Sequence, residues 1–152
     1  MNDTCQPGLS RDVAKSGPDA GTLSAVLEAA ERLQRRLDSA LVGVGLSISK
    51  FDALDQLIST DEPLTLGDLA GRLHCVRSNI TQLIDRLEAD GLVKRGSCSD
   101  DRRAVRAKVT PIGEERHAAG VTAIRAVQAA FAEKLGAGDR DRLVRLLSAL
   151  EG

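Results

Sequence analysis

Residues 64–110 decide the fold of the chain, and they read LTLGDLAGRLHCVRSNITQLIDRLEADGLVKRGSCSDDRRAVRAKVT. Up to Asp90 the apolar residues recur at spacings of three and four, which predicts two short helices separated by the turn His74-Cys75-Val76. We expect residues 92–95 and 105–109 to form two antiparallel strands around a polar tip. The segment therefore predicts a helix-turn-helix followed by a β-hairpin.

The second predicted helix has an apolar stripe on one side and small polar side chains near its start. Ser78, Asn79 and Gln82 are the polar residues in that place. The major groove of double-stranded DNA admits a helix whose first residues contact base edges, and Asn or Gln can pair with adenine. Cations and the N–H groups at a helix start bind phosphates. We predict these DNA contacts on the helix: Arg77, Ser78, Asn79, Thr81, Gln82 and Arg86.

The positive charge of the chain is concentrated in the same segment. Residues 77–108 hold eight Lys or Arg and five Asp or Glu, a local charge of +3 in a chain whose net charge is −1. A positive segment on an acidic remainder attracts phosphates to one place. The charge distribution therefore favours a nucleic-acid partner, although the net charge alone does not.

The predicted hairpin is basic on one face. Its alternation turns Val105, Ala107 and Val109 inward and Arg106 and Lys108 outward. The tip at residues 100–103 reads DDRR, which would place one arginine in an adjacent minor groove with Asp101 orienting it. We predict DNA contacts from Arg102, Arg103 and Arg106.

The chain on both sides of the segment is helical and aliphatic. Residues 1–21 are rich in Pro and Gly and are expected to form a flexible arm. Residues 22–45 and 111–152 offer more apolar helix surface than one compact unit can cover, which predicts a symmetric homodimer. The predicted fold is mainly α, with a winged helix-turn-helix of three helices and a two-stranded β-wing at residues 46–110 on a helical dimerisation base.

Cap residues and glycines predict where these helices begin and end. The predicted helix starts are Thr22, Ser47 or Ser49, Thr65 with Asp68, Thr110 with Pro111, and Asp139. The predicted helix ends are at Gly43 and Gly45, at Asp90-Gly91 and at residues 136–138.

The composition argues against several other classes of protein. Phe51 and Phe131 are the only aromatic residues, which disfavours single-stranded DNA or RNA as a ligand. The Ser, His and Asp residues fall in caps, turns and charged faces, so we expect no enzyme. The Cys and His residues lack ligand spacing, so we expect no metal and no cofactor. No apolar run approaches the ~20 residues of a membrane helix and no signal segment is visible, so we expect a cytoplasmic protein without a membrane partner.

Three runs, LTLGDLAGRL, SNITQLIDRLEADGLVKR and DDRRAVRAKVTPIG, resemble the winged helix-turn-helix of the multiple-antibiotic-resistance regulator (MarR) family. The resemblance is strong over residues 46–115 and rests on helix layout elsewhere. It implies an obligate homodimer, a recognition helix at residues 77–90, and Arg103 as a minor-groove arginine braced by Asp101. It also implies a transcriptional repressor that leaves its pseudo-palindromic operator when an unknown small-molecule effector or an oxidant acts.

The chain departs from this family at the turn. Relatives commonly have Gly-Val-Ser where this chain has His74-Cys75-Val76, so Val76 replaces the usual Ser cap. The recognition helix is therefore expected to begin at Arg77 or Ser78.

Two alternative functions remain open on the sequence. A helical protein-interaction module, an anti-repressor or scaffold, would keep the winged fold without reading DNA, but the outward cations of the hairpin favour DNA. A redox-sensing version would use Cys98 beside the hairpin cations or Cys75 beside a helix start. The family's peroxide sensors pair a cysteine near the first helix with tyrosines, and this chain has no Tyr and its Cys5 lies well before that helix.

Overall fold

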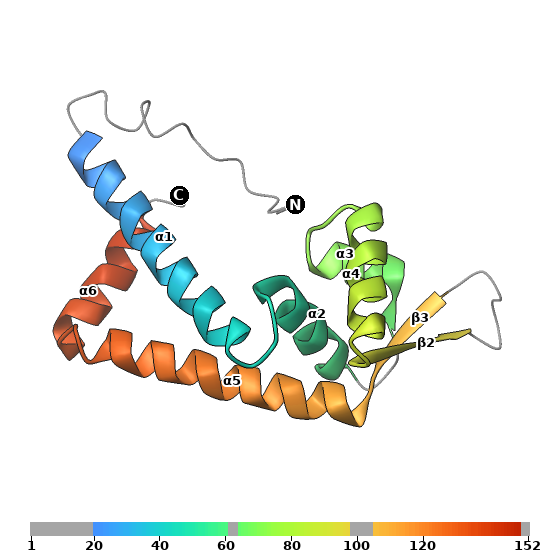
Figure 1. Cartoon of the computed structure of the whole chain (residues 1–152). Helices are drawn as coiled ribbons and strands as arrows, with labels where there is room; N and C mark the ends of the chain where they lie inside the picture. The colour runs from blue at the N-terminus through green and yellow to red at the C-terminus, as the bar shows by residue number, and fades with distance from the viewer. Residues whose placement is uncertain (1–19, 61–63, 98–104, 150–152) are drawn as a thin grey trace. The chain divides into compact units, whose positions relative to one another are not determined.

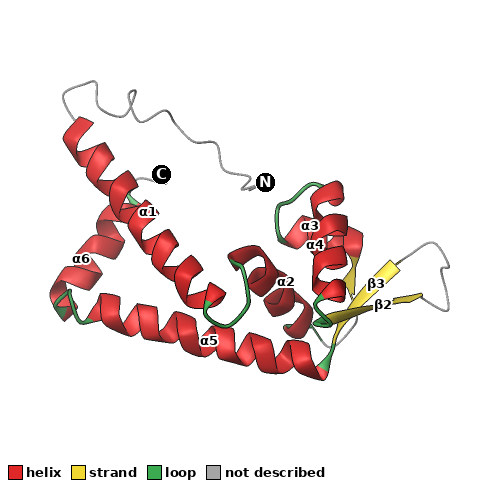
Figure 2. Ribbon diagram, in the orientation of Figure 1, coloured by secondary structure: helices red, strands yellow, loops and turns green. Residues whose placement is uncertain are grey.

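The computed structural model describes residues 20–60, 64–97 and 105–149. The chain divides into two compact units, residues 1–36 and 37–152. The described elements, in chain order, are α1 (Ala20–Val42), α2 (Ile48–Ile58), β1 (Leu64–Thr65), α3 (Leu66–Arg72), α4 (Arg77–Ala89), β2 (Val93–Ser97), β3 (Val105–Val109), α5 (Pro111–Ala132) and α6 (Ala137–Ser148). Helices make up most of the described chain, and the strands form one small sheet (Figure 2).

Helix α1 begins earlier than the sequence predicts. It already includes Ala20 and Gly21, so the prediction of Thr22 as its cap is wrong and the helix extends into the predicted arm. It ends at Val42, as the glycines after it predict. Gly45 has a φ of 74°, which favours glycine, and the Leu46 N–H then donates to the Leu41 carbonyl at 2.9 Å.

The helix starts of the winged region follow side-chain caps. Ser47, rather than Ser49, caps α2, because its hydroxyl accepts from the Lys50 N–H at 3.3 Å. Thr65 and Asp68 form a reciprocal capping box at the start of α3, as predicted. Helix α5 begins with Pro111 directly after its cap Thr110, which is also as predicted.

Helix α6 begins differently from the prediction. Its cap position is Gly136 and no side chain caps it, while Asp139 lies inside the first turn. The prediction that Asp139 caps this helix is therefore wrong. The preceding helix, predicted to end at residues 136–138, ends earlier, at Ala132. The aspartate still favours the helix start, because a negative charge in the first turn complements the helix dipole.

The sheet has three strands rather than the predicted two. Its order is β1-β3-β2, and both neighbouring pairs are antiparallel. In β3 only Ala107 is fully buried, while Val105 is 43% exposed, so the prediction that Val105 faces inward is wrong. Val105 pairs with Ser97 at the end of the hairpin that extends away from the helices, where no core covers it (Figure 1).

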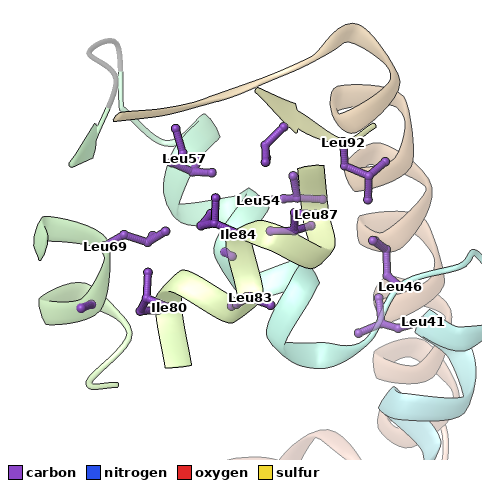
Figure 3. Packing of buried hydrophobic residues seen from close by; sticks show 14 residues of the cluster. Leu41, Leu46, Leu54, Leu57, Leu69, Ile80, Leu83, Ile84, Leu87 and Leu92 are labelled. Atoms are coloured by element: carbon purple, nitrogen blue, oxygen red, sulfur yellow. The ribbon is translucent and has the colours of Figure 1, made fainter. Parts of the chain in front are cut away.

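One hydrophobic core lies inside the winged region and includes the end of α1 (Figure 3). Its fully buried side chains come from α1, α2, α3, α4, β2 and β3, and the largest are Leu41, Leu54, Leu69, Ile80, Ile84, Leu87 and Val93. Helix α4 contributes four residues at spacings of three and four, which is the stripe expected from its sequence. The core therefore fixes which side of α4 faces solvent.

Helix α5 approaches this core closely through two glycines. Gly113 and Gly120 are both buried. A Cβ at Gly113 would collide with the Leu92 carbonyl oxygen, and one at Gly120 would lie 2.7 Å from the Phe51 ring. Glycine lowers helix propensity, but at these two positions there is no room for a side chain, because α5 lies so close to Leu92 and Phe51. Among residues 20–60, 64–97 and 105–149, the helices lack the combination of length and apolar character that a membrane span requires.

Candidate nucleic-acid interface

The turn between α3 and α4 sets the direction of α4. His74 has a φ of 50°, and the Cys75 N–H donates to the Ala70 carbonyl at 3.0 Å, which closes the turn. Val76 occupies the cap position of α4 and offers no side-chain hydrogen bond. The helix begins at Arg77, one of the two starts predicted. Its first N–H groups therefore keep their capacity to donate to a ligand oxygen.

The side of α4 opposite the core is polar and exposed. Ser78, Gln82 and Asp85 lie on one face, because they are spaced by four and three residues. Asn79 is half-buried beside this face. The structure thus brings together the polar residues for which base contacts were predicted, on a rigid helix that the core holds from behind.

The residues predicted to hold phosphates already make local contacts. The Thr81 hydroxyl donates to the Arg77 carbonyl at 3.1 Å, and Arg86 Nε donates to the Gln82 carbonyl at 3.3 Å. The Arg77 guanidinium passes over Gly67, where an added Cβ would lie 2.9 Å from its Nη2. All three side chains remain exposed at the ends and edges of α4.

Arg106 lies at the junction of β3, β1 and α3. It pairs in register with Thr65, it is half-buried, and its Nε is buried without a hydrogen-bond partner among the described residues. The Thr65 hydroxyl and N–H bond to Asp68 and lower the pKa of that carboxyl, with smaller contributions from Arg106 and Arg72. Arg106 is therefore less outward than the sequence predicts, whereas Lys108 is exposed as predicted.

Sequence reasoning missed Arg95 of β2. Its Nη2 lies 2.5 Å from Asp85 Oδ1 and donates to the Thr81 carbonyl at 3.2 Å, and its Nη1 lies 3.6 Å from Glu88 Oε2. Its backbone N–H donates to Glu88 at 3.1 Å. The only sequence signal was an arginine in a strand next to two acids in the preceding helix, which no periodicity connects.

The remaining predicted site residues are only partly described. Asp101, Arg102, Arg103 and Cys98 lie outside the described residues. Cys75 is half-buried and packs against the core. Within the described residues no three His, Cys, Asp or Glu side chains gather as metal ligands do.

His117 belongs to α5, and its side chain is mostly buried against α2. Its Nε2 lies 2.9 Å from Asp55 Oδ1, and its ring stacks on Phe51 with centroids 5.0 Å apart. Arg116 of the same helix donates to the Val44 carbonyl at 3.0 Å. Beside it lies an open hollow lined by Gly43, Val44, Gly45, Ile112, Glu115, Arg116 and Ala119.

Known proteins resemble this chain in sequence and in structure. The sequence pattern of the MarR family matches residues 46–105. A curated relative, the HTH-type transcriptional repressor YetL of Bacillus subtilis (strain 168), is 31% identical over 102 residues, which cover 64% of this chain and 61% of YetL. Over residues 46–105 the chain is therefore similar to the MarR family. The HTH-type transcriptional regulator YkoM of the same bacterium is 33% identical over 104 residues, 68% of this chain and 66% of YkoM.

The chain spans less than two thirds of the length of the relatives it matches, with shares of 61%, 35% and 53% in three of them. Among solved structures it is similar to the transcriptional repressor CouR bound to a 23-mer DNA duplex, with a TM-score of 0.77 and 23% identity. That match covers 89% of this chain and 96% of CouR. The likeness confirms the winged helix-turn-helix fold predicted from the sequence.

Proposed function

We propose that the protein is a transcriptional regulator, a homodimeric repressor that binds double-stranded DNA at a specific sequence. The observation that carries the proposal is the outer face of α4, where Ser78 and Gln82 stand exposed on a helix whose other side is locked in the core. A rigid helix with Ser, Asn and Gln near its start is suited to the major groove. The domain limits predicted from the sequence are part of this proposal.

The proposed contacts divide by their chemistry. Base edges are read by Ser78, Asn79 and Gln82, and phosphates are held by the cations and the helix start. The proposed phosphate and minor-groove contacts are Arg77, Thr81, Arg86, Arg102, Arg103 and Arg106, with Asp101 bracing Arg103.

A second copy of the chain is the proposed protein partner. Helix α6 has no buried residue, although it carries Val144, Leu146 and Leu147, which are 63%, 59% and 41% exposed. A two-fold pair of chains would cover this face and present two recognition helices. The operator would then be a pseudo-palindrome whose half-sites lie about 34–36 Å apart, one turn of DNA.

We also propose how the protein is regulated and where it acts. A small-molecule effector would release the DNA, and the hollow beside Arg116 is one place where such a molecule would meet α5 and the α1–α2 loop. The protein would act where genomic DNA is, in the cytoplasm, and would catalyse no reaction. A redox role for Cys75 is less favoured, because Cys75 packs against the core.

Fluorescence anisotropy with duplexes from the promoter of its own operon tests the proposal. We expect tight binding that weakens steeply with salt, because bound cations release counterions from DNA. Gln82→Ala should relax sequence preference by about 1–3 kcal/mol, as for one bidentate base contact. Gln128→Ala, an exposed glutamine of α5 outside the recognition helix, is the matched control and should leave the sequence preference unchanged. Absence of salt-dependent binding would instead favour the protein-interaction module.

A further inference from the structure

Two carboxylates stand on the outer side of α4, among the residues proposed to contact DNA. Asp85 follows Gln82 by three residues and Ser78 by seven, so it lies on the same face as both. Glu88 is one turn further on, and the side chains of Asp85 and Glu88 are 53% and 41% exposed. Unpaired carboxylates at this place would repel the phosphates that the face has to approach.

Arg95 supplies a counter-charge to both acids from the neighbouring strand. One guanidinium lies against Asp85 and Glu88, while the Arg95 N–H donates to Glu88. A further bond runs from Arg95 Nη2 to the Thr81 carbonyl. The contacts thus connect β2 to three successive turns of α4, at Thr81, Asp85 and Glu88, and the Arg95 side chain is only 29% exposed.

We propose that Arg95 is a positioning residue of the DNA interface, an internal counter-ion that masks Asp85 and Glu88 and holds α4 on the hairpin. The proposal rests on the proposed function and deepens it. Arg95 acts through the two acids and contacts no phosphate itself. Its Nη1 and Nη2 are both committed to α4, and its Nε is buried without a partner among the described residues.

This role predicts opposite signs for the two halves of one ion pair. Arg95→Gln leaves two acids unmasked, so affinity for a promoter duplex at low salt should fall by about tenfold. Asp85→Asn removes an acid from the face and keeps the arginine, so affinity should rise, by about threefold or more. In the double variant Asp85→Asn/Arg95→Gln the local charge equals that of the wild type, and affinity should return to within about threefold of it.

Lys50 and Asp90 offer a matched control pair. Lys50 Nζ lies 2.5 Å from Asp90 Oδ2, an ion pair between α2 and the C-cap of α4, away from the outer face. Asp90→Asn therefore removes the same charge and breaks a comparable pair. We expect it to leave DNA affinity within about twofold of the wild type, because its distance from the phosphates allows solvent screening.

The measurement is a set of anisotropy titrations at several salt concentrations, with thermal unfolding as a check on each variant. The wild-type titration is read first, because its failure removes the proposed function itself. If the wild type binds and Asp85→Asn weakens binding, the pair is only structural and the inference is wrong. A double variant that stays weak, with a salt slope reduced by about one, would assign Arg95 to a phosphate instead. Should Arg95→Gln fail to fold, the sign of the Asp85→Asn effect still decides.

Discussion

Among the described residues, His74 is the one with a positive φ that is not a glycine. It has a φ of 50°, in the turn between α3 and α4, and it is exposed. The left-handed region costs a residue with a Cβ about 1–2 kcal/mol, and glycine adopts it readily. We predict that His74→Gly raises the free energy of unfolding by about 0.5–1 kcal/mol, because the greater chain entropy of glycine offsets part of the gain. A higher urea midpoint at an unchanged slope would measure this.

His74→Ala separates the backbone effect from loss of the imidazole. Alanine keeps the Cβ that makes the left-handed region costly, so this variant should gain nothing. Equal stabilisation by alanine and glycine would show that the histidine side chain, and not the φ angle, is unfavourable in the turn.

At the scale of one element, α5 can lie close to the core because two of its buried positions are glycines. Gly120 faces Phe51 and Leu46, and an added Cβ would lie 2.7 Å from the Phe51 ring and 3.2 Å from Leu46. We predict that Gly120→Ala lowers the free energy of unfolding by about 1–3 kcal/mol through overpacking. Alanine in an open helical site has the opposite effect, a gain of up to about 1 kcal/mol. Chemical denaturation would show the sign directly.

Gly138 in α6 is the control for this substitution. An added Cβ there meets nothing within 4 Å, so Gly138→Ala should be neutral or stabilising. If Gly120→Ala were stabilising as well, the close approach of α5 to α2 would not exist in solution.

The elements differ in how well their sequence predicts them. Periodicity and caps were sufficient for α4, for the capping box at Thr65 and for the start of α5 at Pro111, because these signals are local. Strand β1 was missed because it has two residues and forms only by pairing with β3. The partners of Arg95 were missed because they depend on how β2 packs on α4. The outer face of α4 was predictable, whereas the ion pairs that mask its acids were not.

At the scale of the whole molecule, the described chain leaves an apolar helix face uncovered. Leu146 and Leu147 of α6 are half exposed, and no residue of that helix is buried. Exposed apolar surface of this kind marks an interface, because its burial contributes about 25 cal/mol per Å². The proposed symmetric pair of chains would cover this surface and would present two α4 helices to the two half-sites of the proposed operator.

We predict that Leu146→Glu converts the protein from a dimer to a monomer, because a carboxylate in an apolar interface loses its hydration without gaining a partner. Sedimentation velocity would measure the change in mass. Ser148→Glu is the control, since it adds the same charge on another side of α6 and should leave the dimer intact.

The monomer should bind a two-half-site duplex at least about 100-fold more weakly, because linked half-sites add avidity that a single site lacks. An unchanged mass with unchanged affinity would mean that α6 is covered by something other than a second copy, and the geometry of the operator would have to be reconsidered.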